Sequence, residues 1–106
     1  MDNDHTISDA FKAFVTETPA HQKVWIEMVQ KLGSANKLDP KAKVAAYLAV
    51  LAACKLHTGI TFHVKQAKTL GFTREEVASA ILTGLPAVGN IVIQALPIAL
   101  DAYDNE

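Results

Sequence analysis

The feature that most constrains the fold is an uncharged apolar run of eleven residues, from Val44 to Cys54. Crossing a bilayer as a helix takes roughly 20 residues, so we expect a buried helix and no contact with a membrane. A helix that is apolar on all sides must be covered on all sides. Because a chain of 106 residues has few other elements to do this, we expect further copies of the chain to supply part of the cover. The run therefore predicts a homo-oligomer.

The residues around this run predict an all-α fold. Thr18-Pro19 and Asp39-Pro40 each place a capping side chain directly before a proline, which suits the first turn of a helix. Thr73 and Glu76 have the spacing of a capping box, in which each side chain bonds the other residue's amide. The sequence has no alternating strand pattern. We therefore expect a compact bundle of about six helices, near residues 7–17, 19–32, 40–56, 61–70, 74–82 and 90–103.

Glycine and proline positions refine these boundaries. Gly33 is expected to end the second helix, since glycine favours the position after a helix C-terminus. Residues 84–90 are expected to form a compact turn before the last helix. Pro97 lies inside that last helix and removes one of its backbone hydrogen bonds, so we expect a kink near Ile93.

Length and composition indicate one domain without a polyanion-binding surface. We expect a single domain over residues 1–106. Only 20% of the residues are charged and the net charge is −1, so nucleic acid is not an expected partner. The polar N-terminus argues against a signal peptide, and the single cysteine argues against a disulfide-stapled secreted domain. We therefore expect a cytoplasmic protein.

His63 is the side chain best suited to carry chemistry. It falls in the first turn of the helix expected near 61–70, between apolar Phe62 and Val64. The positive end of a helix and partial burial both favour a neutral imidazole, which can take up a proton as a base and return it as an acid. The alternative is a core histidine whose ring bonds a backbone carbonyl, and the residues alone favour that interpretation.

Cys54, His57 and His63 are the one other candidate constellation, as metal ligands. Cys54 and His57 are three residues apart and would face the same way if the helix continued. Metal sites usually need three or four ligands with supporting side chains around them, so we expect neither a metal site nor a cofactor. Cys54 is the one possible thiol nucleophile, but it ends an apolar run, and we expect it to be buried and unreactive.

Charged residues near His63 have simpler explanations than catalysis. Lys65, Lys68 and Arg74 would attract an anionic substrate, but such residues usually form a solvated helix face. Glu75 and Glu76 are expected to cap the helix that follows and to balance its dipole.

The order of these segments resembles the carboxymuconolactone decarboxylase family, which includes the alkylhydroperoxidase D proteins. The similarity covers about residues 38–103, which form the expected family core behind N-terminal helices in residues 1–37. The resemblance implies an all-helical domain of the alkylhydroperoxidase D-like type that assembles as a trimer or hexamer. The residues that carry it are Leu38–Lys43, leading into an alanine-rich helix, then Gly59–Ala67, Leu70–Val77 and Gly84–Gly89.

The resemblance carries over only part of the family's redox chemistry. The redox branch has the pattern Glu…Cys-x-x-Cys-x-x-x-His, in which the cysteines cycle through a disulfide while Glu and His relay protons. His63 matches the histidine, but the cysteine positions fall on Leu56 and Gly59, and the glutamate position falls on Val44. Cys54 lies two residues before the first cysteine position, about 200° away around a helix. The hydroperoxidase reading is therefore disfavoured.

The decarboxylase branch needs no dithiol. Loss of carbon dioxide from a carboxylated lactone or keto acid leaves an enolate-like charge, which a histidine in an apolar pocket can protonate. The favoured hypothesis is a lyase acting on such a small molecule, with His63 as acid/base and Ile60, Phe62 and Lys65 as candidate substrate-binding residues. Two alternatives stay open, so the chain is not assigned as an enzyme at this point. They are an antioxidant hydroperoxidase with Cys54 as its lone nucleophile and a non-catalytic oligomeric binding protein.

Overall fold

The computed structural model describes residues 7–105, and every regular element within them is helical, as predicted. Residues 1–6, which the sequence analysis found too polar for a signal peptide, lie outside this range. The chain divides into two compact units, with the boundary between Leu38 and Asp39. Six helices of the described range have eight residues or more: α1 (Asp9–Glu17), α2 (Pro19–Ala35), α3 (Pro40–Ala53), α4 (Ile60–Thr69), α5 (Arg74–Ile81) and α7 (Leu96–Asp104). Between them lie the short helix α6 (Leu85–Val88) and 3₁₀ turns at His57–Gly59, Gly89–Ile91 and Ile93–Ala95.

The first unit consists of α1 and α2 packed against each other. Ser8 caps α1, because its hydroxyl oxygen accepts a hydrogen bond from the Phe11 amide at 3.1 Å. Phe11, Phe14 and Trp25 join the two helices through ring contacts, with centroids 5.4, 6.0 and 6.1 Å apart. The apolar stripe of α2 stays largely uncovered, and Val24 is 65% exposed.

Two predicted features of α2 are wrong. Thr18 precedes Pro19 as expected, but its hydroxyl donates to the Phe14 carbonyl at 2.7 Å and so closes α1 without capping α2. Helix α2 also continues through Gly33 to Ala35. Glycine inside a helix costs about 1 kcal/mol but is not an obligatory stop.

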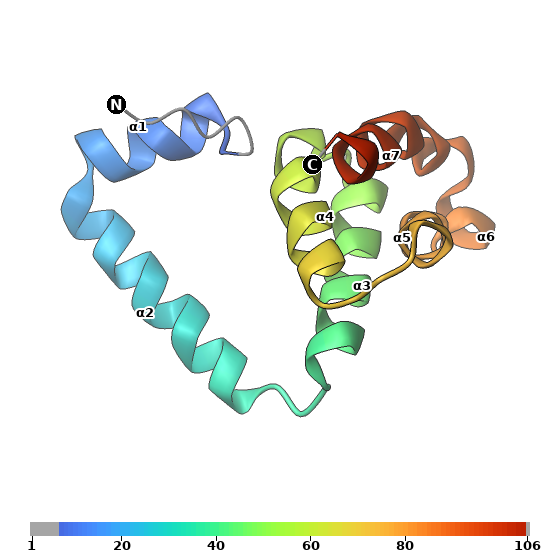
Figure 1. Cartoon of the computed structure of the whole chain (residues 1–106). Coiled ribbons are helices and arrows are strands. Elements are labelled where there is room, and N and C mark those ends of the chain that lie inside the picture. Colours follow the sequence, from blue (N-terminus) through green and yellow to red (C-terminus); the bar gives the residue numbers. More distant parts are fainter. Residues whose placement is uncertain (1–6, 106) are drawn as a thin grey trace. The chain divides into compact units, whose positions relative to one another are not determined.

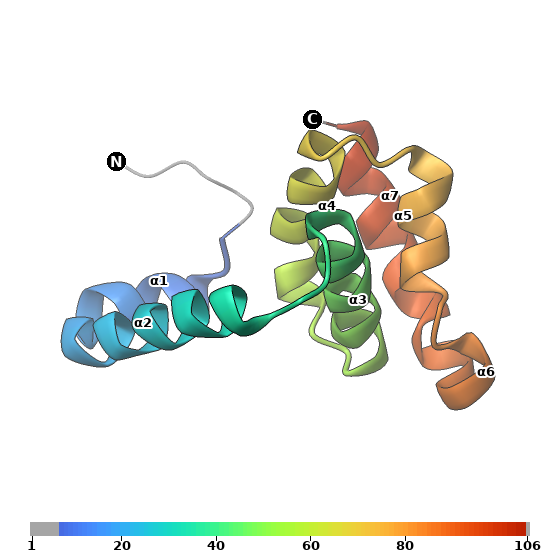
Figure 2. The same ribbon diagram turned by 90° about the horizontal axis from the view of Figure 1, so that it is seen from below.

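The second unit is a ring of four helices (Figures 1 and 2). Helix α3 packs against α4 and α5, and α7 packs against the same two helices. Asp39 caps α3 by accepting a hydrogen bond from the Ala42 amide at 2.9 Å, with proline in the first position as predicted. The predicted capping box is present at α5. The Glu76 amide donates to the Thr73 hydroxyl at 3.1 Å, and the Thr73 amide donates to the Glu76 carboxylate at 2.8 Å.

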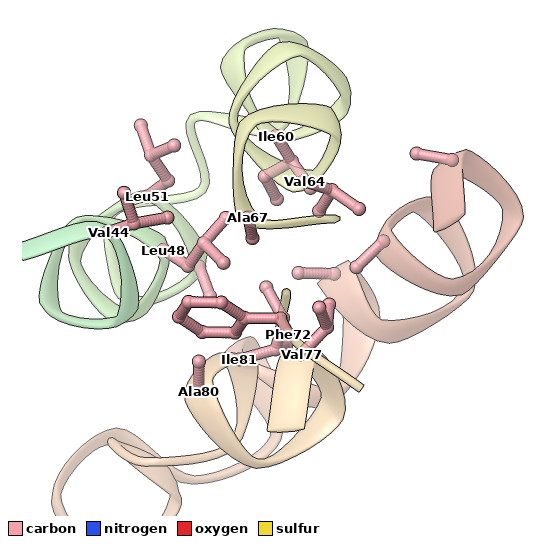
Figure 3. Packing of buried hydrophobic residues seen from close by; sticks show 14 of the residues in the cluster. Val44, Leu48, Leu51, Ile60, Val64, Ala67, Phe72, Val77, Ala80 and Ile81 are labelled. Carbon is pink, nitrogen blue, oxygen red and sulfur yellow. The ribbon is translucent and has the colours of Figure 1, made fainter. Parts of the chain in front are cut away.

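The core of this unit lies inside the ring (Figure 3). Apolar side chains from α3, α4, α5 and the loop between α4 and α5 meet there; the labelled ones are Val44, Leu48, Leu51, Ile60, Val64, Ala67, Phe72, Val77, Ala80 and Ile81. Helix α3 buries only one side of its apolar surface in this core. On its other side, Tyr47 is 48% and Val50 is 53% exposed. The expectation that this helix is covered on every side is therefore not met within the second unit.

Long-range polar contacts attach α7 to the rest of the ring. The Tyr103 hydroxyl donates to the Phe72 carbonyl at 2.8 Å. Arg74 donates two parallel hydrogen bonds to Asp104, at 2.8 and 2.9 Å, and holds the pKa of that carboxyl below its ordinary value. Lys68 donates to the Tyr103 carbonyl at 2.7 Å, near the negative end of α7. These contacts fix the C-terminal end of α7 to residues 68–74, which include the end of α4 and the start of α5.

The ends of α3 and α7 depart from the predicted boundaries. Helix α3 stops at Ala53, because Lys55 takes a left-handed conformation with φ of 59°. Helix α7 begins at Leu96, after two 3₁₀ turns, with Pro97 in its first turn. The prediction of one helix over 90–103 with a kink near Ile93 is wrong. Proline is accommodated in a first turn, where its missing N–H has no partner to lose.

No single helix among residues 7–105 combines the length and apolar character that crossing a membrane requires. Two segments, Arg74–Ile91 and Ile93–Asp104, meet that requirement only as a pair, and the pair is bent by 119°. The most apolar helix, α3, has 14 residues.

The capping box gives the first testable prediction. We expect Thr73→Ala to lower the free energy of unfolding by about 1 kcal/mol, because the Glu76 amide at the start of α5 loses the Thr73 hydroxyl as its acceptor. For a domain of this size that loss lowers Tm by about 4–8 °C. Urea denaturation followed by circular dichroism measures it. The matched control is Thr83→Ala, whose hydroxyl is exposed and bonds only the Ser79 carbonyl; an equal loss in the two variants would contradict the capping argument.

Candidate functional site

His63 lies in α4, in contact with aromatic rings from two helices. The centroid of its imidazole is 4.4 Å from that of the Tyr47 ring on α3 and 5.1 Å from that of Phe62 on α4. The Phe62 ring meets the imidazole edge-on, at 88°, while the Tyr47 ring is tilted by 54°. His63 is partly buried, whereas both aromatic neighbours are exposed. The imidazole is therefore shielded from water on part of its surface and lies beside two exposed aromatic side chains.

Gln66 supplies a hydrogen-bond partner to His63 from the next turn of α4. The Nδ1 atom of His63 lies 3.1 Å from the Oε1 atom of Gln66. Burial lowers the pKa of His63 below 6.5, and the weaker opposing effect of the Gln66 hydrogen bond raises it. The predicted preference for a neutral imidazole is confirmed, with burial as its main cause.

The three predicted substrate-binding residues have different surroundings. Phe62 is exposed and touches His63 directly. Ile60 is completely buried in the core, so it supports α4 from the inside of the ring. Lys65 lies on the same helix and is partly buried.

Lys68 and Arg74, the other members of the predicted basic set, serve the fold. Both use their donors on α7, Lys68 on the Tyr103 carbonyl and Arg74 on Asp104. Lys68 also lies 4.7 Å from the centre of the Tyr103 ring. Arg74 is exposed, as expected for a solvated helix face, and Lys68 is partly buried; both also attach α7 to the ring.

Cys54 is exposed, so the prediction of a buried thiol is wrong. It follows Tyr47 by seven residues and Val50 by four, and so continues the uncovered face of α3. His57 differs from it, because its Nε2 atom is buried and has no hydrogen-bond partner in the described part of the chain. Among residues 7–105, no group of three or more His, Cys, Asp or Glu side chains is arranged to hold a metal ion.

An open groove of about 610 Å³ lies on the opposite flank of α3, between α3 and α5. Lys41 lies there 3.7 Å from Glu76 and 5.1 Å from the centre of the Phe72 ring. Lys41 and Glu76 are thus paired with each other, and the groove contains none of the predicted site residues. The groove is lined by Asp39, Lys41, Ala42, Ala45, Phe72, Glu75, Glu76, Ser79, Ala80 and Thr83.

Sequence reasoning missed two residues at His63. Gln66 is three positions further along the same helix, and that spacing alone was a usable signal, since such residues are neighbours on a helix surface. Tyr47 had no comparable signal, because it belongs to α3 and reaches His63 only through the packing of α3 on α4.

Comparison with known families decides the relationship. The sequence model of the carboxymuconolactone decarboxylase family matches residues 19–101. The chain belongs to this family. The match starts with α2 and ends within α7, so it extends beyond the 38–103 region on the N-terminal side. No curated protein and no solved structure gave a significant match.

The structure places the residues that stand at the redox positions of the family pattern. Val44, at the glutamate position, is buried in the core. Leu56 and Gly59, at the cysteine positions, flank and end the 3₁₀ turn before α4. Leu56 is exposed, and Gly59 packs beside the Leu51 side chain. Of the four residues in the redox pattern that the resemblance implies, this carboxymuconolactone decarboxylase family member has only the histidine, at His63.

The lowered pKa of His63 predicts a pH dependence. Folding favours the neutral imidazole, so the contribution of His63 to stability is complete above pH 6.5 and is lost as pH falls through its lower folded pKa. In an NMR titration we expect a midpoint below that of the same histidine in the urea-unfolded chain. His63→Gln assigns the signal and should flatten the stability profile below pH 6.5.

The control for this titration is His21→Gln, which removes an exposed histidine of α2 and should leave the His63 signal unchanged. A His63 midpoint equal to or above that of the unfolded chain would contradict the burial argument.

Proposed function

We propose that this protein is a small-molecule lyase that removes carbon dioxide from a carboxylated lactone or keto acid, with His63 as the acid/base. The observation that carries the proposal is the placement of His63. It is the one family relay residue present, its pKa is lowered by burial, and it stands between two exposed aromatic rings. Such a group exchanges protons readily near neutral pH.

The proposed reaction needs one proton and no oxidant. The bond between the substrate carbon and its carboxylate breaks, carbon dioxide leaves, and the electron pair stays behind as an enolate. The neutral imidazole of His63 takes up a proton from water, and the resulting imidazolium delivers that proton to the enolate carbon and becomes neutral again. The hydroxide that the water leaves combines with carbon dioxide as bicarbonate, so the cycle closes without a change in oxidation state. A lowered pKa makes the imidazolium a stronger acid toward the enolate.

Phe62 and Lys65 are the proposed substrate-binding residues. Phe62 offers an exposed apolar surface directly beside the imidazole. Lys65 is on the same helix and carries the positive charge that a carboxylate substrate needs. Ile60 contributes by fixing α4 against the core.

The structure meets one requirement of the hydroperoxidase alternative, an exposed thiol, but the chain lacks a second cysteine. The thiol of Cys54 is exposed, which suits a nucleophile better than the predicted buried position. The chain has one cysteine, however, so a disulfide cycle within it is impossible and an external thiol would have to complete each turnover. The lyase remains the favoured function.

We expect carbon dioxide release to depend on His63. Purified protein is assayed with a panel of carboxylated lactones and β-keto acids, and His63→Gln should lower kcat by about 10²–10⁴-fold through loss of the acid/base. His21→Gln is the matched control and should keep the activity of the wild type. Undiminished turnover in His63→Gln would exclude the proposed role. Absence of turnover in all three folded proteins would favour a binding protein.

We also propose that the chain assembles with itself, as a trimer or hexamer. The support is the uncovered apolar surface on α2 and on the outer face of α3, where Val24 and Val50 are more than half exposed. Such surfaces are usually covered in solution by another polypeptide.

Light scattering coupled to size exclusion tests this assembly. We expect a mass of three or six times 11.4 kDa for the wild type and a smaller species for Val50→Asp, because a buried unpaired charge opposes association. Ser79→Asp places the same charge on an exposed position of α5 and should elute as the wild type does. A stable wild-type monomer at micromolar concentration would refute the proposal.

A further inference from the structure

The contact between His63 and Gln66 bears on which ring nitrogen carries the proton. The Oε1 atom of Gln66 is a carbonyl oxygen, so it has lone pairs and no hydrogen to donate. It lies 3.1 Å from Nδ1 of His63. This geometry fits the Nδ1–H form of the neutral imidazole, in which Nδ1 donates to Oε1.

This tautomer leaves Nε2 as the basic nitrogen. The two nitrogens are bonded to the same ring carbon and their lone pairs or hydrogens point in different directions. When Nδ1 faces Gln66, Nε2 therefore faces away from it. The Nδ1–H bond to Gln66 is also compatible with the imidazolium, in which both nitrogens are donors. The same hydrogen bond can therefore form in the neutral and in the protonated ring. It stabilises the protonated ring more, and so it raises the pKa of His63.

Tyr47 and Phe62 help to keep the ring in this orientation. Rotating the imidazole by half a turn about its bond to the Cβ atom would carry Nδ1 away from Gln66. The Tyr47 ring on α3 and the edge-on Phe62 ring on α4 lie against the imidazole and oppose this rotation. A polar group and two aromatic rings therefore favour the same orientation of the imidazole.

We propose that Gln66 is a positioning residue that holds His63 in the Nδ1–H form, so that Nε2 is the nitrogen that gives and takes the substrate proton. The tautomer itself is a property of the resting protein, and its use in proton transfer rests on the lyase function proposed above. Free imidazole side chains in water prefer the opposite, Nε2–H form, which makes the effect of Gln66 measurable.

Nitrogen-15 NMR of the histidine side chains tests the tautomer without a substrate. In the wild type above the pKa of His63, we expect a protonated-type signal for Nδ1 and an unprotonated-type signal for Nε2. Gln66→Leu removes the acceptor and should shift the population toward Nε2–H. Gln66→Glu keeps an acceptor, so it should preserve Nδ1–H while raising the pKa of His63 through its negative charge.

Gln30→Leu, the same substitution at an exposed position of α2, is the control and should leave both His63 signals unchanged. Circular dichroism confirms that each variant is folded. A wild type that is mainly Nε2–H would overturn the proposal, and so would a Gln66→Leu variant with the tautomer of the wild type.

Activity separates this inference from the lyase proposal. If turnover is found, Gln66→Leu should lower kcat several-fold with little change in KM, and Gln66→Glu should retain more of kcat. Full kcat in a Gln66→Leu variant whose tautomer has changed would overturn the positioning role. If the tautomer responds as expected but no protein turns over any substrate, the lyase function fails while the assignment of Gln66 stands.

Discussion

Burial of one side of α3 is the constraint on which the rest of the second unit depends. The helix has no charged residue between Val44 and Cys54, so its apolar side chains are driven out of water as a continuous surface. Leu48 and Leu51 fill the centre of the ring, and α4 and α5 pack on the two flanks that remain beside them. The position of His63 follows from this arrangement, since α4 brings the imidazole against Tyr47 at the edge of α3.

The two flanks of α3 have different chemistry. On the α5 side, Lys41 is paired with Glu76, which also completes the cap of α5, so the charges there are used by the fold. On the α4 side, an imidazole stands among aromatic rings with a glutamine amide as its polar neighbour. Partial burial favours the neutral imidazole, which must take up a proton before it can donate one.

The family relationship and the residues at the site point to different parts of the family's chemistry. A match over residues 19–101 covers most of the described helices. Yet the resemblance puts Val44, Leu56 and Gly59 at the redox positions, and these residues cannot carry electrons or protons. The proposed lyase would use His63 for proton transfer, whereas a disulfide cycle within the chain requires a second cysteine.

Local signals in the sequence were enough to establish the all-α class and the caps at Asp39 and Thr73, and they singled out His63 as the candidate for chemistry. Each depends on side-chain type and on spacing within one helix, which a sequence displays directly. The exposure of Cys54, the start of α7 at Leu96 and the contact of Tyr47 with His63 depended on packing between helices. No local pattern encodes these features, because the free energy that selects them comes from contacts between segments far apart in the chain.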